Sequence, residues 1–135
     1  MTEIRKITKV SLIALGIVWF LFGILEVFLL DYFINPMMGW NNPLSPRMFG
    51  GMLFVGSVFT IILLTKKTWE EIKLTYALLF AFFVATIPIE LIVAILFGST
   101  LPSEAITQTI IDQVIMCSLF TLGIVSYVMQ ERKSN

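Results

Sequence analysis

The sequence predicts an all-α integral membrane protein, a four-helix bundle built as a single transmembrane domain over residues 1–135. Of the 135 residues, 58% are hydrophobic and only 13% are charged, whereas charged residues make up about 25% of an ordinary globular protein. The apolar residues gather in four long runs, and about 20 apolar residues suffice to cross a bilayer. The lipid bilayer is therefore the expected surroundings. Because basic and acidic residues are equal in number, no nucleic-acid partner is indicated.

The first apolar run extends from Val10 to Leu30 behind a basic start, as the hydrophobic part of a signal peptide would. It is too long for that role, and it ends without a small-residue cleavage site. We therefore expect an uncleaved first helix at about 7–30. Turn-forming residues follow between Asp31 and Ser45, which predicts a loop there.

Three more helices are expected, at about 46–65, 68–97 and 103–130. Proline at the first helical position, Pro46, is typical of a helix start. The segment from Thr68 to Glu71 has the capping-box pattern, in which two side chains satisfy free N–H groups at a helix start. Gly98 is a plausible end for the third helix, and Ser103 begins the fourth.

The basic residues are divided unequally between the two sides of the membrane. Eight belong to the side that holds both predicted chain ends, and Arg47 alone belongs to the other side. Since cytoplasmic loops carry the excess of lysine and arginine, we expect a plasma-membrane protein with both termini in the cytoplasm. The eight are Arg5, Lys6, Lys9, Lys66, Lys67, Lys73, Arg132 and Lys133.

Each predicted helix carries one ionisable residue on a row of small and polar residues, which indicates a shared interior. In the first two helices the rows are Leu12, Gly16, Trp19, Gly23, Glu26 and Leu30, and Arg47, Gly50, Phe54, Ser57 and Ile61. In the last two they are Tyr76, Leu79, Phe83, Thr86 and Glu90, and Ala105, Thr109, Asp112, Met116, Leu119, Gly123 and Ser126.

The carboxylates on these rows lie at similar expected depths. At 1.5 Å per residue, Glu26 is about 6 Å from the outer end of its helix. Glu90 and Asp112 are each about 10 Å from theirs. We therefore expect a polar, acidic pocket in the outer third of the bundle and apolar packing in the inner two-thirds. Cys117 is expected to be a small core residue.

Glu90 is the expected centre of this pocket. Pro88 leaves the carbonyl of Val84 without its helical partner, so carbonyl and carboxylate could converge on one ligand. The pattern predicts a site for a proton, a cation or a small polar ligand entering from outside. The alternative is an ion-pair cluster that fixes helix register. For Glu26 the ligand site and the ion-pair cluster are equally favoured. The candidate ligand-binding residues are Glu90, Asp112, Glu26, Arg47, Thr86, Gln108 and Gln113.

Several kinds of chemistry are excluded by residue type. The chain has no histidine, which excludes a Glu-x-x-His di-iron site and a histidine-ligated haem. Its single cysteine, Cys117, excludes an intrachain disulfide and a C-x-x-C redox pair. An all-oxygen set of carboxylates would suit calcium, magnesium or manganese. No nucleophile–base pair is present, so no catalytic residue, metal ligand or cofactor is assigned.

The first helix, with Gly16, Phe20, Gly23 and a polar residue at Glu26, resembles the first helix of DoxX-like four-helix membrane proteins. The segment at 43–51, Pro-Leu-Ser-Pro-Arg-Met-Phe-Gly-Gly, is similar to the start of the second helix in small relatives of that group. The resemblance implies four spans and, for some members, association with membrane redox complexes. Many members carry lysine or histidine in place of Glu26.

Two further functions remain open beside ligand binding. The polar rows could pack against a membrane-protein partner, or against another copy of the chain in a homo-oligomer. In that reading the protein is an accessory subunit of a larger membrane complex. The resemblance implies the other, a DoxX-like membrane redox component.

The expected orientation is testable with reporter fusions. A reporter joined after Ser134 should read cytoplasmic, and one inserted within 39–43 should read external, because of the eight-to-one division of basic residues. Paired reporters that are active on opposite sides of the membrane measure this directly. A C-terminal fusion that reads external would overturn the orientation and the depths assigned to the carboxylates.

Overall fold

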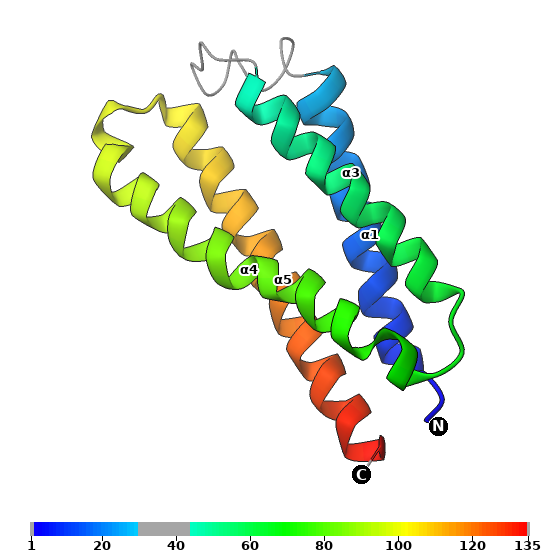
Figure 1. The fold of residues 1–135 in the computed structure, drawn as a ribbon. Helices are drawn as coiled ribbons and strands as arrows, with labels where there is room; N and C mark the ends of the chain where they lie inside the picture. Colours follow the sequence, from blue (N-terminus) through cyan, green and yellow to red (C-terminus); the bar gives the residue numbers. More distant parts are fainter. Residues whose placement is uncertain (1, 30–43, 135) are drawn as a thin grey trace.

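The structure, a computed structural model, describes residues 2–29 and 44–134 (Figure 1). The described part is helical: α1 (Lys6–Phe28), α3 (Leu44–Leu64), α4 (Trp69–Phe97) and α5 (Ser103–Ser134), with a short 3-10 helix η2 (Gly98–Thr100) between the last two. All four long helices are long and apolar enough to cross a membrane. The predicted all-helical class is thereby confirmed, and the helices indicate a multi-pass membrane protein.

The helix boundaries agree with the predictions to within a few residues. The capping box is present, because the Glu71 carboxylate accepts a 3.1 Å hydrogen bond from the Thr68 N–H at the start of α4. α3 begins at Leu44, so Pro46 lies inside its first turn rather than at its first position. α5 continues to Ser134, beyond the expected end at about 130. The predicted end of the first helix at residue 30 and the loop at 31–43 lie outside the described residues.

α4 is continuous through its proline and ends where a glycine was expected to stop it. Pro88 lies inside the helix, which runs without interruption to Phe97. Gly98 has φ −56° and ψ −32°, which is right-handed helical backbone. The chain therefore tightens into η2 instead of turning through a left-handed cap.

The helices form two arms that meet at one end (Figure 1). α1 and α3 lie side by side along most of their lengths, and both chain termini lie at the same end of the molecule. The η2 end of the α4–α5 hairpin diverges from α1 and α3. The buried core lies between the arms, where Trp19 meets Phe82 edge-on with ring centroids 5.5 Å apart and also contacts Phe83.

Glycines occupy the closest helix crossings. A Cβ atom at Gly16 would lie 2.3 Å from Thr60 Oγ1, and one at Gly123 would lie 2.1 Å from the ring of Phe80. These distances are far below van der Waals contact, so only glycine permits the observed approach. The small residues of the predicted rows thus lie between helices, as expected.

Most of the predicted interior rows are confirmed. Tyr76, Phe83 and Ser126 are fully or almost fully buried. The α3 row is wrong at both ends. Arg47 is exposed, and Ile61 is 63% exposed while the neighbouring Thr60 is buried in its place. The helix is rotated so that Thr60 fits against Gly16. Cys117, expected in the core, is exposed.

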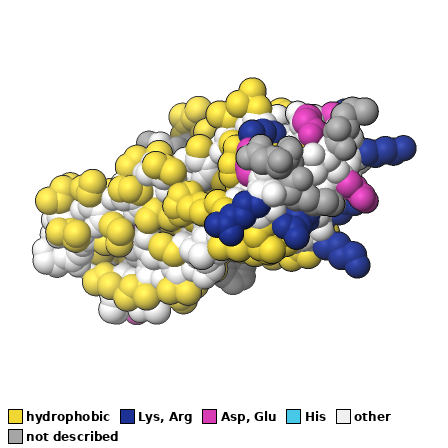
Figure 2. All heavy atoms as spheres, turned by 90° about the horizontal axis from the view of Figure 1, so that it is seen from below, with side chains coloured by type: hydrophobic (Ala, Val, Ile, Leu, Met, Phe, Trp, Pro, Cys, Tyr) yellow, Lys and Arg dark blue, Asp and Glu magenta, His cyan; other side chains and the backbone are white. Residues whose placement is uncertain are grey.

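Apolar side chains cover much of the outside of the helices. They are densest on the second half of α4, where Ile95 is 80% exposed. In Figure 2 hydrophobic side chains spread over the visible face, while lysine and arginine gather toward the end that holds the termini. An apolar exterior of this extent suits lipid rather than water.

The glycine packing leads to a prediction within α3. Gly56→Ala should lower the free energy of unfolding by about 1–3 kcal/mol through overpacking, since the new Cβ would lie 2.2 Å from the Trp19 ring. Gly51→Ala is the matched control, because nothing lies within 4 Å of a Cβ there. It should be neutral or stabilising, given the higher helix propensity of alanine. Thermal unfolding of both variants in detergent measures the difference, and equal stabilities would contradict the observed helix contact.

Candidate functional site

The candidate ligand-binding residues lie at the end of the molecule opposite the chain termini. Glu26 is in the last turn of α1, and Arg47 is in the first turn of α3. The remaining five come from the hairpin: Thr86 and Glu90 from α4, and Gln108, Asp112 and Gln113 from α5. All seven therefore belong to the halves of the four long helices that lie away from the chain termini.

Glu26 is the most constrained of the three carboxylates. Its atom Oε2 is buried and accepts no hydrogen bond, the single such side-chain atom in the described part of the chain. Gly50 of α3 makes room for it, because a Cβ at Gly50 would lie 2.8 Å from the Cβ of Glu26. Because α1 and α3 pack closely here, the Glu26 side chain lies within their interface.

Glu90 is half-buried and is held by a side chain from α5. The Gln113 Nε2 group donates a hydrogen bond to a Glu90 carboxylate oxygen and lies 3.4 Å from the carbonyl oxygen of Ile87. A carbonyl beside Pro88 and the carboxylate therefore meet at one amide group. This carbonyl belongs to Ile87, one residue before the proline, whereas the carbonyl of Val84 was expected to lie beside the carboxylate.

Asp112 of α5 is the third acid. Its Oδ1 atom accepts a 2.8 Å hydrogen bond from Gln108 Nε2, one turn earlier in α5. Asp112 is close enough to Glu26 and to Glu90 for its charge to act on both. The three acids therefore form one electrostatic group across α1, α4 and α5, which we call the carboxylate layer.

Thr86 and Arg47 are the two remaining candidates. The Thr86 hydroxyl donates to the carbonyl of Phe82 in its own helix at 3.1 Å and so is already engaged. Arg47 is exposed at the start of α3, and its expected closeness to a carboxylate stays a prediction. Over residues 2–29 and 44–132, no three carboxylate or thiol groups lie close enough together to hold a metal ion.

A mainly apolar hollow of about 330 Å³ lies beside Gln113, between the η2 ends of α4 and α5. Leu91 and Ala94 line it from α4, and Ile106 and Ile110 line it from α5. The Gln113–Glu90 pair therefore lies at the edge of an apolar space rather than of a water-lined one.

A second polar cluster lies at the end that holds the termini, where apolar packing was expected. Gln130 of α5 is fully buried. Its Oε1 accepts the Arg5 backbone N–H at 2.8 Å, and its Nε2 donates to the Glu3 carbonyl at 3.1 Å. The Gln130 amide thus forms two hydrogen bonds with the backbone before α1, as a neighbouring β-strand would.

Hydroxyl groups extend this cluster between three helices. The Thr8 hydroxyl donates to Gln130 Oε1 at 3.2 Å and accepts from Ser126 at 3.2 Å. Ser11 lies 3.4 Å from Ser126 and 2.7 Å from the Tyr76 hydroxyl. The cluster, which we call the hydroxyl–amide network, joins α1, α4 and α5. The expectation of purely apolar inner packing is wrong for this reason.

The chain before α1 is also paired on its other side. The Trp69 N–H donates to the Thr2 carbonyl at 2.8 Å, and the Ile4 N–H donates to the Lys67 carbonyl at 3.4 Å. The segment is therefore fixed between the α3–α4 connection and Gln130. Thr8 and Ser11 lie about one turn before Leu12 and Leu15 of α1, a spacing that places them on the same helix face. This spacing indicates that the two hydroxyl groups are buried, but only apolar packing was expected at that depth.

Comparisons of this chain with protein-family models, with curated proteins and with solved structures find no match. The resemblance to DoxX-like proteins accordingly stays a prediction.

Proposed function

We propose that the carboxylate layer binds a proton or a small cation within the membrane-embedded part of the protein. The observation that carries the proposal is the buried, unpaired Oε2 atom of Glu26. A carboxylate oxygen removed from water without a partner is costly, and an isolated buried charge costs far more. A positive occupant removes that cost.

The surroundings of Glu26 favour a positive occupant over a neutral one. Asp112 adds a second acidic group within electrostatic reach, and Asp112 in turn acts on Glu90. Repulsion of Asp112 with each of the two glutamates in apolar surroundings favours a bound proton or cation at these acids. A neutral ligand would leave the repulsion in place.

The two glutamines orient the acids for this role. Gln108 engages one oxygen of Asp112, and Gln113 engages one oxygen of Glu90. Each amide leaves the second oxygen of the same carboxylate for a ligand. These hydrogen bonds restrict the carboxyl groups, and ordered acceptors bind a cation with less loss of side-chain entropy.

We further propose that the carboxylate layer faces outward in the plasma membrane, with both termini in the cytoplasm. The distribution of basic residues supports this orientation. Lys6 and Lys9 lie in the first turn of α1, Lys66 and Lys67 connect α3 to α4, and Arg132 lies near the end of α5. All belong to the end opposite the carboxylate layer.

The binding proposal is tested by neutralising the acids one at a time in the full chain. Glu26→Gln and Glu90→Gln should each weaken binding by about tenfold to a hundredfold, the effect of losing one charged partner. Binding is measured by calorimetric titration with sodium, potassium and calcium ions and by proton uptake in detergent. Affinity for the metal ions should fall as the pH is lowered, because protons compete for the same carboxylates.

Glu104→Gln is the matched control, since Glu104 is an exposed acid in the first turn of α5. It should leave all of these affinities unchanged. The proposal fails if the Glu26 and Glu90 variants bind as the unaltered chain does while their stability changes. That outcome would assign the carboxylates to helix register alone.

A further inference from the structure

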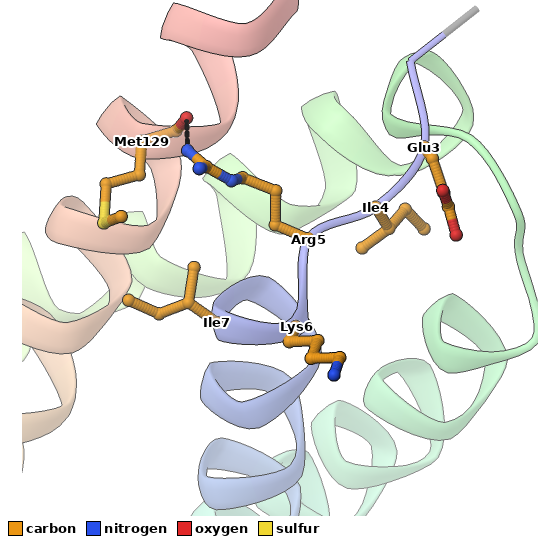
Figure 3. A pocket seen from close by; sticks show the side chains of 6 residues that line it. All are labelled: Glu3, Ile4, Arg5, Lys6, Ile7 and Met129. Atoms are coloured by element: carbon orange, nitrogen blue, oxygen red, sulfur yellow. Dashed lines mark hydrogen bonds between the residues drawn. The ribbon is translucent and has the colours of Figure 1, made fainter.

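A second hollow, of about 420 Å³, lies at the end that holds the chain termini (Figure 3). It is formed where the segment before α1 passes the last turns of α5. Its lining combines charged and apolar side chains: Glu3, Ile4, Arg5, Lys6, Ile7 and Met129. None of these residues belongs to the carboxylate layer.

Arg5 is held in place at this hollow from two sides. Its Nη1 donates a 2.7 Å hydrogen bond to the Met129 carbonyl, and its backbone N–H is bound by Gln130. Figure 3 shows its side chain extended toward Met129, with Ile7 beside it. One guanidinium nitrogen is engaged in this way, and the rest of the planar group remains available to an acceptor. An arginine fixed so firmly loses little entropy on binding.

The acidic side chains of this end are mostly engaged with protein groups. The Glu70 carboxylate accepts the Thr2 N–H at 3.0 Å, and Glu71 accepts the Thr68 N–H and hydroxyl. Glu131 pairs with Lys73 at 2.8 Å. The cations of the hollow, by contrast, are not paired with these acids. Figure 2 shows lysine and arginine side chains projecting from this part of the surface.

We propose that this hollow binds the phosphodiester headgroup of an anionic phospholipid. Arg5 contacts the phosphate, for which the guanidinium fork is suited. Lys6 also lines the hollow, with its side chain directed away from the Arg5 guanidinium in Figure 3, and adds attraction for the anionic headgroup. Ile7 and Met129 contact the glycerol and the first methylene groups of the acyl chains. Because all four helices are long and apolar enough to cross a membrane, their charged end lies where such headgroups are, and basic residues there attract anionic lipids.

The apolar lining distinguishes a lipid from free phosphate. Free phosphate would gain nothing from Ile7 and Met129, and its higher charge would be repelled more strongly by Glu3, which also lines the hollow. A phosphodiester carries a single negative charge and brings an apolar part that these side chains can cover. The inference does not depend on the carboxylate layer, so either proposal can fail alone.

The test uses the purified full chain in a neutral detergent with three probes: short-chain phosphatidylglycerol, short-chain phosphatidylcholine and inorganic phosphate. Binding is followed by the shift in melting temperature and by native mass spectrometry. Phosphatidylglycerol should bind most tightly. Lys6→Gln should weaken it about fivefold, the effect expected for one cation near an anionic headgroup. Arg5→Gln should weaken it further.

Lys67→Gln is the control, because it removes the same charge from the same end without lining the hollow. It should change the affinity less than twofold. Lys6 is exposed, so its variant keeps the test decisive even if Arg5→Gln unfolds. Equal losses for Lys6→Gln and Lys67→Gln would overturn the proposal, and so would phosphatidylcholine that binds as tightly as phosphatidylglycerol. Inorganic phosphate that binds as tightly would assign the hollow to a free anion instead.

Discussion

The hydrogen bonds of Gln130 hold the described arrangement together. This one side chain joins α5 to the segment before α1 through two backbone groups, and Thr8 and Ser126 continue the contact between α1 and α5. Within apolar surroundings there is no water to replace a lost partner, so each unsatisfied polar group costs several kcal/mol. The hydroxyl–amide network satisfies its members almost entirely from within the protein, which fixes how these helices are rotated against one another.

At the end away from the chain termini, the polar groups are less completely paired. There α1 and α3 stay in close contact through Gly23 and Gly50, while the η2 end of the α4–α5 hairpin diverges from them (Figure 1). Glutamine amides satisfy part of the acid groups, and one oxygen of Glu26 is left without a partner. In proteins, polar groups without hydrogen-bond partners are expected mainly at functional sites. The contrast between a paired end and an incompletely paired end is therefore the physical basis of the proposed binding site.

Much of this could be predicted from the sequence. Four long apolar helices follow from the lengths of the apolar runs, and the start of α4 follows from Thr68 and Glu71, because these signals are local. The rows that contain Tyr76, Glu90 and Asp112 were found because side chains three or four residues apart share a helix face. The grouping of the acids at one end follows from their similar depths.

The rest depends on how the helices pair, which a single sequence does not specify. Ile61 was assigned to the interior instead of Thr60, since a rotation of one residue decides which side chain meets Gly16. Gln130 was placed at the end of a helix, where a polar residue needs no partner, yet it is buried against a segment 125 residues away. Cys117 was expected in the core because small apolar residues are usually buried, but none of the described helices covers its side of α5.

The most direct test of the contrast between the two ends compares two single variants by their free energies of unfolding at neutral pH. Tyr76→Phe removes a hydroxyl that is paired with Ser11 and should cost about 1–2 kcal/mol. Glu26→Gln replaces an unpaired acid with a neutral group of the same shape and should leave stability unchanged or raise it. If Glu26→Gln destabilised the protein as much as Tyr76→Phe, the oxygen of Glu26 would have a partner after all, and the central claim would be wrong.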